Sequence, residues 1–410
     1  MDLQINTAPP TIMHIDLNSC FATVEQQAHP HLRGKPVVVA AYITDRGCIL
    51  SPSIEAKKLG IKTGMRVCEA KQIYPNVIVC DTDPDMVRDV NSKLMKIFQD
   101  YSPKVIPKSI DEAIIDFAPV FSKTIDLMKI GWEIKDRIKK EIGEWILCNV
   151  GISTNRFLAK LASSLHKPDG LDLIDHKNLR QVYASVKLTD LHGINTRFEY
   201  RLNSNGIKDP IDFLQAGEKF LKKNVFKSIS GYYWYLRLRG WEIDDYRSER
   251  KSFGQEYSLK EKTDDPEKLK RIIMKLCEKM GRRLRQSEQL ASGVHLGILY
   301  LDHDFWHKGK KLQRSISSTK NLFEEIIKLF YLQPQVQVVS KISVSCFSLN
   351  QNDNQQLELI DMGGEKISRI SYALDKINNR FGEFTVVPAI MIDMKDTVVD
   401  RIAFGKSELL

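Results

Sequence analysis

Two adjacent acidic residues, Asp111 and Glu112, interrupt a segment, 105–117, that otherwise has the composition of a buried β-strand. Most Asp-Glu pairs lie in solvated turns, because these residues are seldom buried unless they are paired or bind a metal. Here apolar residues lie on both sides of the pair. Two desolvated carboxylates would repel each other unless a cation neutralised them. We therefore predict a divalent cation at this pair.

A third carboxylate, Asp16, stands at the end of a short apolar segment, 11–17, which passes into a helical pattern from Phe21 onward. Three carboxylates can hold two hard cations, about 3.5–4 Å apart, as phosphoryl-transfer sites do. Asp16 and the adjacent pair are therefore predicted to be catalytic, metal-binding residues. Asp116, four residues beyond the pair, is not included in this set.

These segments resemble the motifs of the Y-family, or lesion-bypass, DNA polymerases, and the Asn-Ser-Cys-Phe version at 18–21 resembles the bacterial polymerase IV and V branch. The motifs run in order between about residues 12 and 349. They are the strand ending at Asp16 with Phe-Ala-Thr-Val-Glu (21–25), Ser-Ile-Asp-Glu-Ala (109–113), Val-Gly-Ile-Ser (150–153), Lys160, and Lys-Pro-Asp-Gly (167–170). Alone, the last motif would be read as a plain surface turn.

The resemblance implies a multidomain α+β fold, a right-hand polymerase with a ferredoxin-like palm, small fingers, a helical thumb with a helix-hairpin-helix, and an α/β little finger. The expected domains are the palm at 1–19 and 81–168, the fingers at 20–80, the thumb at 169–241 with its hairpin near 188–207, a linker at 242–249, the little finger at 250–349 and a C-terminal tail at 350–410. Residues 1–10 have no periodicity and are expected to be a loose leader.

The resemblance also implies the residues that bind metal and nucleotide. The backbone carbonyl of Leu17 is expected to join the three carboxylates in binding two Mg²⁺ ions. Phe21 is expected to be a steric gate whose ring clashes with a ribose 2′-hydroxyl, although it could also be a core aromatic. The expected dNTP-binding groups are the backbone N–H groups of Ser19, Cys20 and Phe21, the Ser51 hydroxyl, and the ammonium groups of Lys57 and Lys167.

Two positions depart from the family pattern. The fingers helix reads Ile-Glu-Ala-Lys at 54–57, where the family usually has Tyr-Glu-Ala-Arg. Lys57 lacks the bidentate fork of Arg, and Ile54 cannot donate a hydrogen bond, so we expect a modest nucleotide affinity. Leu50 is bulkier than a roomy site would need, which argues against tolerance of large lesions.

Hydrophobic periodicity predicts the elements that must position these residues. In the first half of the chain, helices are expected at 86–101, 122–142 and 155–165, with a strand at 146–152. From residue 251 onward we expect a β-α-β-β-α-β arrangement with a helix at 266–286 and a strand at 293–301. The tail is expected to form one amphipathic helix at 365–381.

Charge indicates where the chain would bind DNA. The formal net charge is +9, and the segment 250–349 carries 19 Lys and Arg against 11 Asp and Glu. A run of charged residues usually forms a solvated face, but this one could bind and neutralise DNA phosphates. The predicted helix at 266–286 holds eight of these cations. The expected DNA-binding residues are Gly193 and Asn195 in the helix-hairpin-helix, where Asn195 stands in for a glycine and tolerates a positive φ, and Lys251, Lys310, Lys311 and Arg314.

A short segment in the tail resembles the bacterial motif that docks into a sliding clamp. Its residues are Gln356, Leu357, Leu359 and Ile360, with Ile360 where Phe is commoner. A clamp is therefore an expected partner, beside primer-template DNA and dNTP. The chain is otherwise expected to be a monomer.

Composition excludes several other classes of protein. Seven scattered cysteines without a Cys-x-x-Cys spacing argue against a disulfide framework or structural zinc. No apolar stretch approaches the roughly 20 residues of a membrane span, and no signal pattern is present, so a cytoplasmic location is expected.

The predicted function is template-directed addition of dNTPs to a primer 3′ end in translesion synthesis. Low fidelity is expected, because no exonuclease signature is found. One alternative is another two-metal enzyme on a similar palm, such as a nucleotide cyclase, which would need no primer-template. The other alternative is an inactive relative that acts as a DNA or clamp adaptor, against which the three carboxylates argue.

Overall fold

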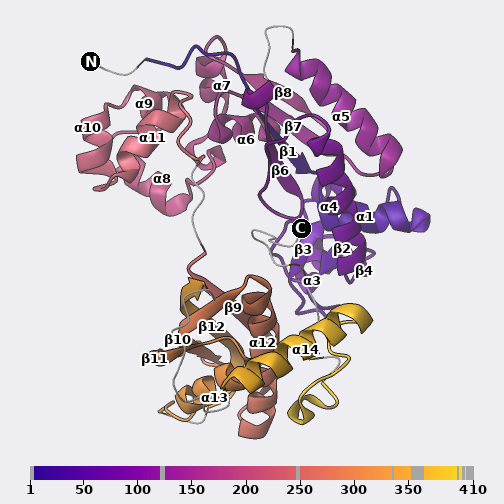
Figure 1. Cartoon of the computed structure of the whole chain (residues 1–410). Helices are drawn as coiled ribbons and strands as arrows, with labels where there is room; N and C mark the ends of the chain where they lie inside the picture. Colours follow the sequence, from indigo (N-terminus) through magenta and orange to yellow (C-terminus); the bar gives the residue numbers. More distant parts are fainter. Residues whose placement is uncertain are drawn as a thin grey trace. The chain divides into compact units, whose positions relative to one another are not determined.

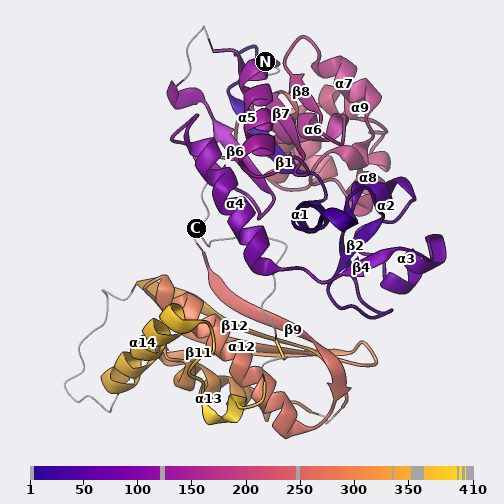
Figure 2. The same ribbon diagram turned by 90° about the vertical axis from the view of Figure 1, so that its right-hand side faces the viewer.

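The computed structural model describes residues 4–120, 125–245, 250–334, 337–351, 364–394, 397, 398 and 402. The chain forms two compact units, Met1–Tyr246 with Arg401–Leu410, and Arg247–Asp400 (Figures 1 and 2). The boundary falls inside the segment 242–249 that the sequence suggests as a linker. Each unit has its own hydrophobic core, and each is described by itself below.

A five-stranded sheet organises the first unit. Its strands, in spatial order, are β5 (Val105–Pro107), β6 (Glu112–Asp116), β1 (Ile12–Leu17), β7 (Cys148–Ser153) and β8 (Leu171–Ile174). β1 pairs antiparallel with both β6 and β7, while β8 pairs parallel with β7. β8 corrects the expected thumb boundary at 169, because it completes the sheet that bears the carboxylates.

Helices cover both faces of this sheet. They are α1 (Cys20–Ala28), α4 (Pro84–Gln99), α5 (Leu127–Glu141) and α6 (Arg156–Leu165). The first three share a core with every second residue of β1, namely Met13, Ile15 and Leu17. On the other face, Ile12 packs against Ala159 of α6. Because side chains alternate along a strand, His14 and Asp16 face α6 as well.

A smaller sheet with two short helices lies in the segment 20–80 that is expected to form the fingers. The strands, in spatial order, are β3 (Ile49–Pro52), β2 (Val37–Ala40) and β4 (Ile78–Cys80), and the helices are α2 (Ile54–Lys58) and α3 (Val67–Ile73). The Ser53 hydroxyl caps α2 by accepting a hydrogen bond of 3.2 Å from the Ala56 N–H. This cap starts the helix directly after β3 and fixes the position of Lys57.

The helical part of the first unit comprises α7 (Leu179–Ser185), α8 (Thr196–Asn203), α9 (Pro210–Gln215), α10 (Glu218–Phe220) and α11 (Ser230–Leu238). The N-terminal segment is hydrogen-bonded to the C-terminal end of this helical part. The Asn6 N–H donates to the Arg239 carbonyl at 2.8 Å, and the Trp241 indole donates to the Gln4 carbonyl at 3.0 Å. The expectation of a loose leader is therefore wrong for these residues.

The first residues of the expected linker are also anchored. Asp244 binds Arg237 of α11, with Oδ2 accepting from Nε at 2.8 Å. Asp245 forms ion pairs with Arg156 and, at 3.1 Å, with Lys104. The linker therefore starts as part of the first unit, because its acidic residues meet three cations there.

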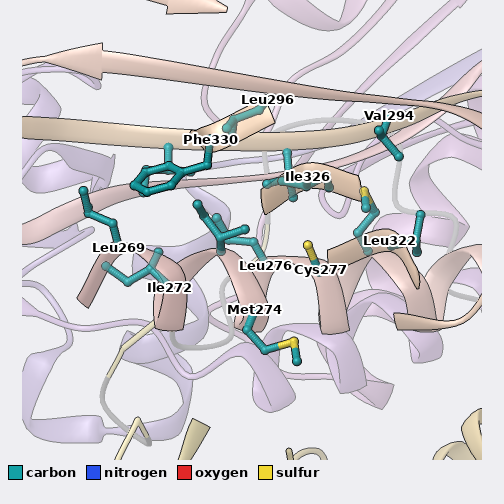
Figure 3. Packing of buried hydrophobic residues seen from close by; sticks show 14 of the residues in the cluster. Leu269, Ile272, Met274, Leu276, Cys277, Val294, Leu296, Leu322, Ile326 and Phe330 are labelled. Carbon is teal, nitrogen blue, oxygen red and sulfur yellow. The ribbon is translucent and has the colours of Figure 1, made fainter. Parts of the chain in front are cut away.

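The second unit has the expected β-α-β-β-α-β order. Its elements are β9 (Ser252–Thr263), α12 (Pro266–Gln286), β10 (Gln289–Tyr300), β11 (Phe305–Ile316), α13 (Thr319–Phe330) and β12 (Val339–Gln351). The strands form an antiparallel sheet with the order β11-β10-β12-β9. Figure 3 shows the core side chains of α12, α13 and β10, including Leu276, Ile326 and Leu296, between the strands and the helices.

α12 is covered on a second side by the C-terminal segment, which begins with α14 (Gly364–Phe381). Met391 and Met394 of this segment belong to the same core as α12, and Met274 points away from the strands (Figure 3). Polar contacts add to the packing. Both oxygens of Asp375 bind Arg285, with distances of 2.6 Å to Nε and 2.8 Å to Nη2.

Further cations of α12 bind the same segment. Arg282 lies 3.0 Å from the Glu383 carboxylate, and the Lys275 ammonium donates to the Met394 carbonyl at 2.6 Å. Arg271 donates to the Ile390 carbonyl at 3.1 Å. The interpretation of this helix as a DNA-binding face is therefore wrong for Lys275, Arg282 and Arg285, which are at most 9% exposed.

Within the described ranges, no helix is long and apolar enough to cross a membrane.

Candidate active site

Strand register brings the three carboxylates together. Asp16 on β1 lies directly opposite Glu112 on β6, and the Leu17 N–H donates to the Asp111 carbonyl at 2.9 Å. Residues opposite each other in an antiparallel pair lie on one face, so Asp16 and Glu112 share the α6 face and Asp111 projects toward α1. We call Asp16, Asp111 and Glu112 the carboxylate edge.

Each acid of the carboxylate edge is bound by the chain itself. Glu112 Oε2 lies 2.7 Å from Lys160 Nζ and 3.4 Å from His14 Nε2. Asp16 forms an ion pair with Lys167. Burial would raise the pKa of Glu112, but the contacts with His14 and Lys160 outweigh it and lower this pKa to about 2. Glu112 is therefore ionised at neutral pH.

Asp111 has the opposite electrostatic environment. Burial raises the pKa of its carboxyl, and the charges of Asp16 and Glu112 raise it further, although the Ser109 hydroxyl, 2.5 Å from Oδ1, opposes the shift. Negative charge at this position is thus unfavourable without a cation. Among the described residues, no three His, Cys, Asp or Glu side chains converge as a ready metal site; the acids bind Lys160, Lys167 and Ser109 instead.

Two of the expected phosphate-binding residues, Lys57 and Lys167, lie near this edge. Burial lowers the pKa of Lys57, and nearby Lys167 lowers it further, while Asp16 and Asp111 oppose the shift. These contributions show that the Lys57 ammonium on α2 lies near Lys167 and the two carboxylates. Ser51 is buried in β3, 6% exposed.

The start of α1 lies next to the carboxylate edge. Ser19 adopts a left-handed conformation with φ 54°, and the first residue of the helix is Cys20. The Ser19 hydroxyl oxygen is buried and has no hydrogen-bond partner in the described part of the chain. A helix start beside an unpaired buried hydroxyl suits an anionic ligand.

Phe21 lies in the core that α1 shares with the sheet, and it is 4% exposed. Leu50 packs against the same core. The two side chains predicted to contact the sugar and the base pair thus adjoin one cluster, and Phe21 fills a core position in the structure. A role as steric gate remains a prediction.

Several polar residues that position the site were not expected from the sequence. The Asn18 carboxamide donates to Asn149 Oδ1 at 2.8 Å, and its own oxygen accepts from the Asp169 N–H at 2.8 Å. Lys135, 2% exposed, donates to the carbonyls of Cys148 and Asp169 at 2.9 and 2.6 Å. These bonds fix the turn that carries Lys167. The available signal was a set of polar residues inside otherwise apolar segments.

Asp116, left out of the predicted set, lies at the other end of β6. It is 5% exposed and forms an ion pair of 2.7 Å with Lys104. Its position opposite Ile12 separates it from the carboxylate edge.

The two residues expected to lie in a helix-hairpin-helix, Gly193 and Asn195, are in the turn before α8. Gly193 has a φ of 99°, which favours glycine. Asn195 has a φ of −104° and caps α8, with its side chain accepting a hydrogen bond of 3.1 Å from the Phe198 N–H. Asn195 therefore does not use the positive φ that it would tolerate in place of glycine, because the helix starts at the next residue.

The four basic residues expected to bind DNA in the second unit do not share one face. Lys310 lies opposite the buried Val294 and binds Glu325 of α13 at 2.9 Å, whereas Lys311 lies opposite Gly293 on the other face. Arg314 is further along β11, and Lys251 is exposed just before β9. The clamp-like residues Gln356, Leu357, Leu359 and Ile360 lie outside the described residues.

A sheet that bears three clustered carboxylates with two lysines beside them, followed by a basic α/β unit, is the organisation of a nucleic-acid polymerase. The impB/mucB/samB family model matches residues 15–164, and the model of its C-terminal domain matches residues 250–359. The chain belongs to this family, the Y family of lesion-bypass DNA polymerases, and it is a DNA-directed DNA polymerase.

Relatives support this assignment over nearly the whole chain. DNA polymerase IV of Pelotomaculum thermopropionicum is 30% identical over 396 residues, which are 95% of this chain and 97% of the relative. DNA polymerase IV of Staphylococcus aureus is 30% identical over 354 residues, 85% of this chain and 98% of the relative. A solved Y-family chimera of Dbh and Dpo4 has a TM-score of 0.70 at 25% identity and covers 83% of this chain and 99% of its own.

Family membership has two consequences for the site. It implies dependence on a divalent metal ion, in agreement with the oxygen donors of the carboxylate edge. It also disfavours the alternative of an inactive adaptor.

Proposed function

We propose that this polymerase extends a primer 3′ end by two-metal phosphoryl transfer, with Asp16, Asp111 and Glu112 as the catalytic metal ligands. The observation that carries the proposal is the strand register that sets Asp16 opposite Glu112, with the Asp111 carbonyl bonded to Leu17. In this mechanism the primer 3′-hydroxyl attacks the α-phosphate of the dNTP, and pyrophosphate leaves. The expected role is translesion synthesis, at low fidelity.

The donor set fits two Mg²⁺ ions. Carboxylates and the Leu17 carbonyl are the hard oxygen ligands that Mg²⁺ prefers, and the raised pKa of buried Asp111 indicates negative charge that a cation would relieve. When bound, the ions lower the pKa of the primer hydroxyl and neutralise the leaving group. The chain contributes the fixed spacing of the three acids and holds Glu112 ionised through Lys160 and His14.

The nucleotide is proposed to bind between α1 and α2. The backbone N–H groups of Ser19, Cys20 and Phe21 would donate to the triphosphate, and the unpaired Ser19 hydroxyl supports an anion there. Lys57, Lys167 and the Ser51 hydroxyl would complete the phosphate contacts. The Phe21 ring is proposed as the steric gate under the sugar, because it lies in the first turn of α1 next to the carboxylate edge.

DNA is proposed to bind through both units. The turn at Gly193 and Asn195 would direct backbone N–H groups at a phosphate without reading sequence. In the second unit, Lys251, Lys311 and Arg314 would bind phosphates, while Lys310 would first have to leave Glu325.

We further propose that the enzyme acts as a monomer that docks onto a sliding clamp through Gln356, Leu357, Leu359 and Ile360.

Primer extension on an undamaged primer-template with Mg²⁺ tests the proposal. We expect the wild type to use dNTPs, Asp111→Ala to lose extension, and Phe21→Ala to gain use of rNTPs. A matched control is Asp136→Ala, which removes an exposed carboxylate paired with Lys140 on α5 and should leave extension unchanged. Retained extension by Asp111→Ala would overturn the metal site, and unchanged rejection of rNTPs by Phe21→Ala would overturn the gate.

A further inference from the structure

Two side chains hold Glu112 from the α6 side of the sheet. Lys160 Nζ lies 2.7 Å from Glu112 Oε2, and His14 Nε2 lies 3.4 Å from the same oxygen. Both contacts use Oε2, so neither of them occupies Oε1. The Glu112 carboxylate is therefore bound to these two residues through Oε2, and Oε1 can bind another ligand.

His14 and Lys160 are fixed relative to each other through Ser163. His14 Nδ1 lies 2.9 Å from the Ser163 hydroxyl, and this hydroxyl donates to the Lys160 carbonyl at 2.9 Å. For Nε2–H of a neutral His14 to face Glu112, Nδ1 must be the acceptor, so the Ser163 hydroxyl hydrogen is shared between Nδ1 and the Lys160 carbonyl. Lys160 and Ser163 lie three residues apart on α6, on one face of the helix. The result is a closed set of contacts from β1 through α6 to β6.

His14 is an unusual residue for this position. It is 1% exposed on the central strand, and its Nε2 atom has no hydrogen-bond partner among the described residues. A buried polar atom without a partner costs free energy, and the group that Nε2 faces is Glu112. An apolar residue would fill this position at a lower cost if packing were its only role.

We propose that Lys160 and His14 are positioning residues that orient Glu112 for metal binding. This inference rests on the proposed function, in which Glu112 is a metal ligand. Without Lys160, the Glu112 carboxylate would turn away from the negative charges of Asp16 and Asp111. With it, Oε2 stays fixed and Oε1 is presented to a cation shared by the three acids. Side chains that hold metal ligands in this way typically change metal affinity or activity by about 10–100-fold when removed.

The test measures Mn²⁺ binding as well as turnover. The full chain is bound to a primer-template with a 3′-dideoxy end and a dNTP, and free Mn²⁺ is followed by electron paramagnetic resonance. For Lys160→Met, which keeps the length of the side chain, we expect the Mn²⁺ Kd to rise about tenfold. On an extendable primer, kcat should fall at least about tenfold, while the KM for dNTP changes less than about threefold.

Two variants serve as matched controls. Lys160→Arg keeps the cation and should stay within about threefold of the wild type in both Mn²⁺ Kd and kcat. Lys140→Met removes an exposed lysine of α5 that pairs with Asp136, and it should change neither quantity.

If Lys160→Met does not fold, Ser163→Ala carries the test, because it removes only the hydroxyl that contacts His14. The Mn²⁺ Kd is then expected to rise about threefold.

An unchanged Mn²⁺ Kd and kcat in Lys160→Met would overturn the positioning role, and so would an unchanged Mn²⁺ Kd in Ser163→Ala. A wild-type chain that binds Mn²⁺ and DNA but extends no primer would instead overturn the proposed function. The two failures are therefore distinguishable.

Discussion

The carboxylate edge and helix α12 both carry dense charge in the sequence, but the fold uses that charge in opposite ways. At the edge, acids from two distant segments meet, and burial together with the charges of Asp16 and Glu112 raises the pKa of Asp111. On α12, Lys275, Arg282 and Arg285 are satisfied by the C-terminal segment. Carboxylates that the fold places beside one another indicate that an external cation binds there. Charges that the fold pairs with opposite charges indicate a role in packing.

The difference has a physical basis in desolvation. A buried ion that finds a partner within the chain loses its hydration but regains an ion pair, as Arg285 does with Asp375. Clustered acids regain nothing from one another, so only cations can stabilise them. Lys160 and Lys167 do so in part, and a metal would complete the neutralisation. Each prediction below tests one side of this comparison.

The largest expected effect is the loss of activity in Asp111→Asn. Turnover in primer extension should fall by about 10³-fold or more, because a ligand for the metal ions is lost. The free energy of unfolding at pH 7 should nevertheless rise. The folded-state pKa of Asp111 is raised, so its ionised form destabilises the folded chain, and the amide removes that charge.

Urea unfolding and steady-state primer extension measure the two quantities on the same preparation. Asp136→Asn, at an exposed position paired with Lys140, is the control and should change neither. Turnover within tenfold of the wild type would contradict a catalytic role for Asp111.

On the other side of the comparison, Arg285→Ala should cost stability and not DNA affinity. The substitution leaves Asp375 buried and unpaired, which costs about 3–5 kcal/mol of unfolding free energy. The DNA affinity of the folded variant should stay within about twofold, because Arg285 is 3% exposed and bound to Asp375. Urea unfolding and fluorescence anisotropy with a primer-template measure the two effects.

Lys268→Ala, an exposed lysine in the first turn of the same helix, provides the control for stability. If Arg285→Ala instead weakened DNA binding tenfold without loss of stability, α12 would be a DNA-binding face and the comparison would fail.

A smaller effect is expected from the pH dependence of Glu112. Its folded-state pKa of about 2 lies below the ordinary value of 4.5, so its ionised form stabilises the folded chain above about pH 4.5. That stability should be lost as the pH falls from about 4.5 toward 2. The difference in unfolding free energy between the wild type and Glu112→Gln should therefore be constant from pH 7 to about 5 and shrink below it. If this difference in unfolding free energy did not change with pH, Lys160 and His14 would not stabilise the ionised Glu112 carboxylate.

The sequence indicates the strand segments that carry the three acids because their pattern is local. Asp16 stands near the end of β1 and the Asp111-Glu112 pair stands at the start of β6, and the apolar residues beside them give each segment the pattern of a strand. The helix expected at 266–286 is observed as α12 for the same reason, since its apolar residues recur with helical spacing and Asp265 caps its start.

The sequence could not predict which charges the fold would pair. The contacts of Arg285 with Asp375 and of Lys160 with Glu112 join residues 90 and 48 positions apart, and periodicity carries no information on such pairs. The resemblance runs only to about residue 349, so it did not describe the segment that covers α12 either. His14 could have been noticed as a lone polar residue between Met13 and Ile15, but its partner Ser163 is 149 positions away.

The smallest effect separates two adjacent lysines of β11. Lys311 lies opposite Gly293 on the sheet face away from the helices, and Lys310 lies opposite buried Val294 and binds Glu325. If Lys311 neutralises one phosphate, Lys311→Ala should weaken primer-template binding roughly fivefold at about 0.1 M salt and reduce the slope of log affinity against log salt by about 1. Lys310→Ala should change affinity less than about twofold, because its ammonium is already paired. Anisotropy titrations at several salt concentrations measure both. Equal losses in the two variants would mean that a lysine paired within the fold still serves DNA, and the distinction between paired and available charge would no longer predict function.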